Sequence, residues 1–154
     1  MTMGKIISVN ISDRKGVPKS PADRAVMVEG LGIENDAHAA PGDRQVSLLM
    51  VESVRKQQKL FSGRPETVHI ELTPGIFAEN LTTEGIDLLD MEIGTLLRAG
   101  GNVRLRLSKI GKECHTKCAI FRKVGDCIMP AEGVFCEVLE GGVIQAGDSI
   151  ERID

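Results

Sequence analysis

Short apolar runs separated by glycine-containing turns constrain the fold of this chain more than any other feature. Within these runs apolar and polar residues alternate, which is the pattern of β-strands with one buried face. Glycine occurs 17 times in the 154 residues and supplies tight corners between the runs. The chain is therefore predicted to be mainly β, folded as a bent, partly closed β-barrel with a few short helices.

One turn and one periodic segment give the clearest local predictions. The turn Gly100–Asn102 lies between two alternating runs and predicts a β-hairpin. Residues 51–60 carry a narrow apolar stripe among polar and charged residues, which predicts a helix. Strands are expected where Ile7, Val9 and Ile11 alternate with polar residues, and at 24–29, 45–50, 95–99, 103–110, 134–139 and 143–153.

Composition excludes several classes of protein. The length suits one domain, expected to span residues 1–154. The net charge is −3 and the chain has no Trp or Tyr, which argues against a nucleic-acid partner. No apolar run is long enough for a membrane span, and the N-terminal residues lack the pattern of a signal peptide. A cytoplasmic protein with reduced thiols is expected.

The segment GKECHTKCAI, residues 111–120, raises the main chemical question. It contains Cys114, His115 and Cys118, and Cys127 follows shortly after it. These four residues are a candidate structural zinc clip, although their spacing does not match paired Cys-x-x-Cys knuckles. Packing is an equally good interpretation of Cys118 and Cys127, because free cysteine is often buried. The roles of Cys118 and Cys127 therefore stay open between packing, a resolving thiol and a metal ligand.

Cys114 is also a candidate nucleophile or ligand. Lys112 and His115 lie beside it, and nearby cations favour the reactive thiolate, although Glu113 opposes them. The residues favour an active Cys114 over an inert one. Cys136, in contrast, lies in the apolar run GVFCEVL and is predicted to be a packed core residue.

Two further segments contain candidate binding residues. The turn-rich stretch around 30–44 holds Asp36, His38 and Arg44, and Arg suits phosphate or carboxylate because its guanidinium donates in a planar fork. The stretch FAEN adds Glu79 and Asn80. Each stretch is equally consistent with an ordinary solvated or capping loop. Only their combination with a cysteine at a barrel rim favours a site.

Three segments, in this order, resemble the MOSC family, the domain at the C-terminal end of molybdenum cofactor sulfurases. GIENDAHAAPGDRQVSLL is similar to the family's early Asp-x-His and Arg-x-Val-Ser-Leu-Leu segment. PGIFAENLTTEG is similar to its Pro-Gly-x-Phe-Gly-Glu-Asn-Leu signature, with Ala78 in place of the glycine. GKECHTKCAI carries the family's defining cysteine, assigned to Cys114. The resemblance covers nearly the whole chain and implies a bent barrel like the β-barrel domain of pyruvate kinase.

The resemblance also implies a function. The family is thought to carry sulfur as a cysteine persulfide, or to hold molybdenum cofactor through that cysteine as a molybdenum ligand. Lys112 and His115 would stabilise the Cys114 thiolate. Asp36, His38, Arg44, Glu79 and Asn80 would line the cofactor cleft.

The resemblance also bears on partners. In the sulfurases a separate pyridoxal-phosphate desulfurase domain makes the sulfur. A chain of 154 residues has no room for that domain, so this chain alone is not expected to bind pyridoxal phosphate. The expected partner is a cysteine desulfurase, or an enzyme that makes or accepts molybdenum cofactor. Any sulfurtransferase-type activity would depend on it.

Two alternatives remain at this stage. One is a non-catalytic module that binds the pterin or molybdenum cofactor without sulfur chemistry. The other is a domain with a structural Cys/His metal clip. The sequence does not distinguish sulfur from cofactor as the cargo, and it does not specify an oligomeric state.

Overall fold

The computed structural model describes residues 3–62, 72–111 and 132–153 of the chain. Within them lie eleven strands and one α-helix. In chain order these are β1 (Met3–Ile11), β2 (Ser20–Ala22), β3 (Arg24–Val28), β4 (Gly32–Ile33), β5 (Val46–Met50), α1 (Val51–Ser62), β6 (Leu81–Glu84), β7 (Leu96–Ala99), β8 (Val103–Ile110), β9 (Val134–Glu140), β10 (Gly142–Gln145) and β11 (Ser149–Arg152).

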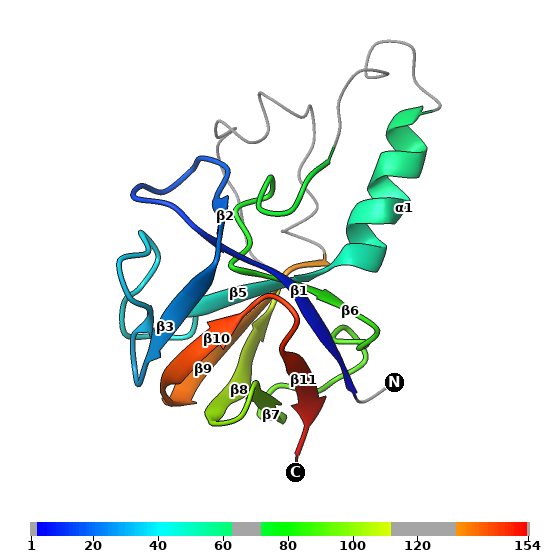
Figure 1. Ribbon diagram of the computed structural model, residues 1–154. Coiled ribbons are helices and arrows are strands. Elements are labelled where there is room, and N and C mark those ends of the chain that lie inside the picture. The colour runs from blue at the N-terminus through cyan, green and yellow to red at the C-terminus, as the bar shows by residue number, and fades with distance from the viewer. Residues whose placement is uncertain (1–2, 63–71, 112–131, 154) are drawn as a thin grey trace.

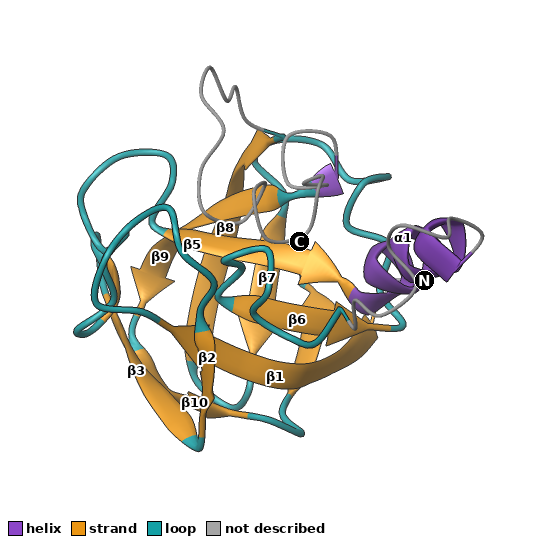
Figure 2. Ribbon diagram, turned by 90° about the horizontal axis from the view of Figure 1, so that it is seen from above, coloured by secondary structure: helices purple, strands orange, loops and turns teal. Residues whose placement is uncertain are grey.

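Seven strands form a closed barrel. Their order is β11-β7-β8-β9-β5-β6-β1, and β1 pairs with β11 to complete the ring (Figures 1 and 2). The β5–β6 pair is parallel, and the other pairs of the ring are antiparallel. Strand β2 extends β1 outside the ring, and β10, β3 and β4 form a separate small sheet. The predicted mainly β barrel is confirmed, and its ring is closed rather than partly closed.

The hairpin of β7 and β8 follows from its sequence pattern. Val103, Leu105 and Leu107 point inward and are fully buried. The two intervening arginines point outward, and each pairs with a glutamate of β9: Arg104 with Glu140 and Arg106 with Glu137. A strand with one buried face alternates in this way. The basic face of this strand is therefore a solvated, ion-paired outer wall.

Strand β1 departs from simple alternation. Its pairing with β6 shifts register between Ile6 and Ser8, as at a β-bulge. As a result Ile6 and Val9 are core residues, and Ser8 and Asn10 are also buried. The predicted alternation of Ile7, Val9 and Ile11 is therefore only partly correct. The bulge brings polar side chains into the interior at the end of β1.

Helix α1 follows β5 directly and stands beside the barrel (Figure 1). It begins at Val51 as predicted and ends at Ser62, two residues beyond the predicted limit. In the described part of the chain, no helix combines the length and apolar character that a bilayer crossing requires.

Cys136, on β9, is fully buried in the barrel core, as predicted.

Strand β5 connects the parts of the chain that carry the predicted site. Leu48 pairs with Leu81 at the start of β6 on one side and with Val134 at the start of β9 on the other. The β8–β9 pairing ends at Ile110 and Val134, and Gly111 N–H donates to Gly133 C=O at 2.6 Å. The described residues on either side of 112–131 therefore lie one strand away from β6.

Candidate functional site

A buried ion pair lies at the centre of the described polar network. Lys19 Nζ is 2.8 Å from Asp36 Oδ1, and neither side chain is exposed to solvent. Lys19 Nζ also lies 3.0 Å from Ser12 Oγ and 2.9 Å from His38 Nδ1. These residues come from the end of β1, the approach to β2 and the turn after β4. The two predicted residues Asp36 and His38 are thus brought together around a lysine.

The Asp36 carboxylate receives several hydrogen bonds. Ser12 N–H donates to Oδ1 at 3.0 Å, and His38 N–H donates to Oδ2 at 3.2 Å. Burial alone would raise the pKa of Asp36, but the Lys19 and Ser12 hydrogen bonds and the Lys19 charge outweigh it. The pKa of Asp36 therefore lies below its ordinary value of 3.8, and the carboxylate is ionised at neutral pH.

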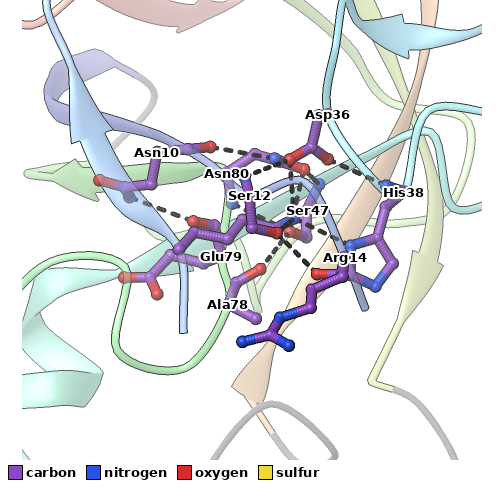
Figure 3. A network of polar contacts seen from close by, with 10 residues as sticks. Asn10, Ser12, Arg14, Asp36, His38, Ser47, Ala78, Glu79 and Asn80 are labelled. Carbon is purple, nitrogen blue, oxygen red and sulfur yellow. Dashed lines mark hydrogen bonds and ion pairs between the residues drawn. The ribbon is translucent and has the colours of Figure 1, made fainter. Parts of the chain in front are cut away.

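Asn80 joins β1 to β5 at the point where β6 begins. Its side-chain Oδ1 accepts from Ser47 N–H at 3.0 Å, and its Nδ2 donates to Asn10 C=O at 3.2 Å. An amide side chain has the donor and acceptor of a peptide group, so Asn80 extends the sheet pairing to the residue before β6. Figure 3 shows Asn80 between Asn10 and Ser47, with Asp36 above it. A side-chain hydrogen bond from Asn80 also helps to lower the pKa of Asp36.

Glu79, the next predicted residue, is fully buried and incompletely satisfied. Its Oε2 accepts from Thr82 Oγ1 at 2.8 Å, whereas its Oε1 has no hydrogen-bond partner. Burial raises the pKa of Glu79 above its ordinary value of 4.5, and the Thr82 hydrogen bond only partly opposes this shift. A buried carboxyl with an unpaired oxygen is more stable when protonated.

The turn that carries Glu79 and Asn80 is held close to Lys19. Lys19 N–H donates to Gly75 C=O at 2.8 Å. A Cβ on Gly75 would lie 2.2 Å from Lys19 O, and Gly75 has φ +90°, so glycine is required there. Ala78, where the family signature has glycine, has φ +63°. This positive φ explains the family's glycine, and it strains an alanine.

The remaining predicted residues lie elsewhere or outside the described part. Arg44 is exposed, and its guanidinium lies 5.8 Å from the centre of the Phe135 ring, a cation–π distance. Lys112, Cys114, His115, Cys118 and Cys127 lie outside the described residues. Burial and, to a smaller degree, the Glu137 charge raise the pKa of Cys136 far above its ordinary value of 9.0, so this thiol is inert.

A polar hollow adjoins the ion pair. It has a volume of about 620 Å³, and its wall includes the polar residues Ser12, Asp13, Arg14, Ser20 and Asn35. Ligand pockets commonly measure about 300–1,000 Å³. The Arg14 guanidinium suits an anionic group such as phosphate, whereas the Asp13 carboxylate opposes one. Among the residues that the structure describes, no group of three His, Cys, Asp or Glu side chains is placed to hold a metal ion.

Sequence reasoning missed Lys19 and Ser12. A lysine between prolines, in the stretch Pro18–Pro21, has the composition of an exposed loop. Its burial depends on Asp36, which lies 17 residues away along the chain. No local pattern in the sequence indicates such a partner.

The MOSC domain family model matches residues 34–151, which include Asp36, His38, Glu79 and Asn80. A search of curated protein sequences gave no match.

Solved structures share the fold. The YuaD protein from Bacillus subtilis has a TM-score of 0.77 and 19% identity, over 97% of this chain and 95% of that one. YiiM from Geobacillus stearothermophilus has a TM-score of 0.72 and 23% identity, over 99% of this chain and 75% of that one. YiiM from Escherichia coli has a TM-score of 0.69 and 19% identity, over 98% and 70% of the two chains. Since the family model spans most of the chain, this protein belongs to the MOSC domain family.

Proposed function

We propose that this protein is a sulfur-carrier or cofactor-handling protein of molybdenum cofactor metabolism, with Cys114 as its working thiolate. The family as a whole is associated with molybdenum cofactor biology. The observation that best supports the proposal is the position of the two ends of the cysteine segment. They lie at Gly111 and Gly133, and Leu48, the β5 partner of Val134, also pairs with Leu81, directly after Asn80. The described residues that flank the cysteine segment are therefore one strand away from Leu81, and this proximity supports a role for the segment beside the buried polar network.

In the sulfur-carrier form, Cys114 accepts sulfane sulfur from the persulfide of a partner cysteine desulfurase. The Cys114 thiolate attacks the outer sulfur of that persulfide. A new S–S bond forms on Cys114, the donor S–S bond breaks, and the donor leaves as a thiolate. The step has no net oxidation or reduction. Lys112 and His115 would stabilise the attacking thiolate.

The described residues also suit the molybdenum cofactor itself. The hollow beside Lys19 has the volume of a small-molecule site, and its wall includes Arg14, Asp13 and two serines. His38 and Arg44 would contact the phosphate or the pterin. Asp36 would hold the His38 turn in place through its hydrogen bond to the His38 N–H. When bound, the cofactor would supply the molybdenum centre, with Cys114 as a ligand to the metal.

The first experiment measures sulfur transfer by intact mass. The protein is incubated anaerobically with cysteine and a cysteine desulfurase, in parallel with Cys114→Ser and Cys136→Ala variants. The parent and Cys136→Ala are expected to gain the mass of one sulfur atom, and Cys114→Ser is not. A gain that persists in Cys114→Ser contradicts the assignment of the carrier thiol. No gain in any protein contradicts the sulfur-carrier form.

A second candidate function is a non-catalytic cofactor-binding module. It is favoured by the fact that the hollow and the ion pair are built entirely from residues without a cysteine. Equilibrium binding of purified molybdenum cofactor that is equal in the parent and Cys114→Ser would support this module over a metal-ligating thiolate. The structural metal clip is tested by elemental analysis. It requires one zinc ion per chain, and it requires that the protein unfold when a chelator removes the zinc.

A further inference from the structure

Lys19 contacts three different side chains with one ammonium group. Its Nζ lies 2.8 Å from Asp36 Oδ1, 3.0 Å from Ser12 Oγ and 2.9 Å from His38 Nδ1. Lysine is almost never fully buried unless it is paired. Here Asp36 supplies the counter-charge, and both side chains of the pair have no exposed surface. The hydrogen bond from Lys19 N–H to Gly75 fixes the backbone from which this side chain extends.

The hydrogen-bond directions around Lys19 are set by chemistry. An ammonium group has three donors and no acceptor. The ionised Asp36 carboxylate only accepts. The single proton of Ser12 Oγ goes to Arg14 C=O at 3.0 Å, which leaves a lone pair of the hydroxyl for Lys19. Both of these partners are acceptors, so Lys19 is charged and donates to each of them.

The contact with His38 must follow the same direction. A charged Lys19 has no lone pair to receive a proton from Nδ1, so Nδ1 of His38 must itself be the acceptor. In a neutral imidazole with an accepting Nδ1, the proton is on Nε2. The His38 backbone is held as well, because its N–H donates to Asp36 Oδ2. The ion pair therefore constrains both the place and the protonation of the ring.

We propose that Lys19 is a positioning residue that fixes His38 as the neutral tautomer with its proton on Nε2. The buried Lys19–Asp36 pair is the structural cause, because it keeps a cationic donor permanently against Nδ1. Asp36 orients that donor, and Lys19 acts on any ligand through His38.

The tautomer determines what His38 offers to a ligand, a step that rests on the proposed function. A ring protonated on Nε2 donates a hydrogen bond from that atom. It has no Nε2 lone pair with which to bind a metal ion or remove a proton. The matching ligand group is an oxygen acceptor, such as a phosphate or a ring carbonyl.

The test is nitrogen NMR of the ¹⁵N-labelled protein without any cofactor. A long-range ¹H–¹⁵N spectrum is recorded at about pH 7.5, where an unperturbed histidine is neutral. The His38 signals are identified by their loss in a His38→Asn variant. The parent is expected to show the limiting shifts of the pure Nε2–H tautomer. Shifts averaged between tautomers, an Nδ1–H ring or an imidazolium in the parent would overturn the proposal.

Three variants separate positioning from general structure. Lys19→Met is expected to move the His38 shifts to values averaged between the two tautomers. Lys19→Arg keeps a cationic donor and is expected to restore the parent pattern. Ser12→Ala removes a different Lys19 partner and is expected to leave the pattern unchanged. A pure Nε2–H pattern that persists in Lys19→Met would also overturn the proposal.

The experiment remains decisive when Lys19→Met does not fold. In that case the double variant Lys19→Met/Asp36→Asn, which removes both buried charges, takes its place with the same expected averaging. No step uses Cys114, sulfur or a cofactor. Failure of the proposed function therefore leaves the tautomer result intact, and failure of the tautomer result leaves the mass experiment intact.

Discussion

Asp36 and Glu79 are two buried carboxyl groups in one polar region, and their pKa values shift in opposite directions. Asp36 has Lys19 at 2.8 Å and two backbone N–H donors, and its pKa is lowered. Glu79 has the Thr82 hydroxyl on one oxygen and no hydrogen-bond partner on the other, and its pKa is raised. Desolvation opposes ionisation in both cases. Glu79 is the more deeply buried of the two and has no cation beside it, so its desolvation dominates, whereas the Lys19 ammonium outweighs desolvation at Asp36.

The polar contacts around Asp36 and those around Glu79 contribute to the structure in different ways. The Asp36 cluster is a charged structure that orients other groups, His38 among them. The second group, Glu79 with its neighbour Asn80, connects the turn before β6 to Thr82 and, through Asn80, to β1 and β5. The first depends on keeping both charges, whereas burial favours the protonated form of the carboxyl in the second.

The largest expected effect comes from removing one charge of the ion pair. Lys19→Met leaves the Asp36 carboxylate buried without its cation, and it is expected to lower the free energy of unfolding by about 3–5 kcal/mol. Urea denaturation at neutral pH measures the change. The double variant Lys19→Met/Asp36→Asn is expected to lose less than Lys19→Met alone. A double variant less stable than either single variant would contradict the account of Asp36.

The next effect is a pH dependence in Glu79→Gln. Because the pKa of Glu79 is raised in the fold, its contribution to stability is full below 4.5 and is lost as pH rises through the folded-state pKa. The variant should therefore gain stability relative to the parent as pH rises, by at most about 1.4 kcal/mol per pH unit. Asp36 has the opposite sign, since its contribution is present above 3.8 and is lost as pH falls through its lowered pKa.

Denaturation curves between about pH 5 and pH 8 test this prediction. Glu92→Gln, at an exposed position, serves as the control and is expected to follow the parent at every pH. A constant offset between Glu79→Gln and the parent would show that Glu79 is ionised throughout and would remove the contrast with Asp36.

A smaller effect is expected from Ala78→Gly in the turn that carries Glu79. Ala78 has φ +63°, a conformation that costs an alanine roughly 1–2 kcal/mol and costs glycine little. The variant is expected to raise the free energy of unfolding by about 1 kcal/mol, because part of the gain is offset by the flexibility of glycine in the unfolded chain. Ala99→Gly, inside β7, is the control and should destabilise the protein.

The smallest expected effect is on the reactivity of Cys136, whose buried thiol is protonated at neutral pH. It is expected not to react with iodoacetamide in the folded protein, because burial suppresses its thiolate. Pulse labelling followed by peptide mass mapping measures this, with the urea-unfolded protein as the positive control. Rapid labelling of Cys136 in the native state would mean that the β5–β9 wall opens locally.

The parts of the fold that depend on neighbouring residues in the sequence could be predicted. The β7–β8 hairpin was predictable because an alternating run lies on each side of the Gly100–Asn102 turn, and helix α1 because its periodicity is local. The bulge between Ile6 and Ser8 was not predictable, because it depends on how β1 meets β6 along the barrel. The closure of the ring depends on pairing between Met3 and Glu151, at opposite ends of the sequence.

The site was predictable only in part for the same reason. Asp36 and His38 could be named from their spacing and from the family resemblance, and the structure brings them together. The burial of Lys19 results from contacts with Asp36, Ser12 and Gly75 that are distant in sequence. The hydrogen bonds of the Asn80 side chain to Ser47 and Asn10 also join residues that are distant in sequence, so no local pattern indicates them. The roles of Cys114 and its neighbours stay predictions.

The hydrogen bond between Gly111 and Gly133 has an evolutionary consequence. It joins Gly111 to Gly133 where the β8–β9 pairing ends, so the described chain on the two sides of residues 112–131 is already connected. The cost of closing a loop grows only slowly with its length. The sequence between Gly111 and Gly133 can therefore be lengthened, shortened or exchanged while every barrel strand keeps its register. A lineage with this barrel can therefore acquire new chemistry in one segment without inventing a new fold.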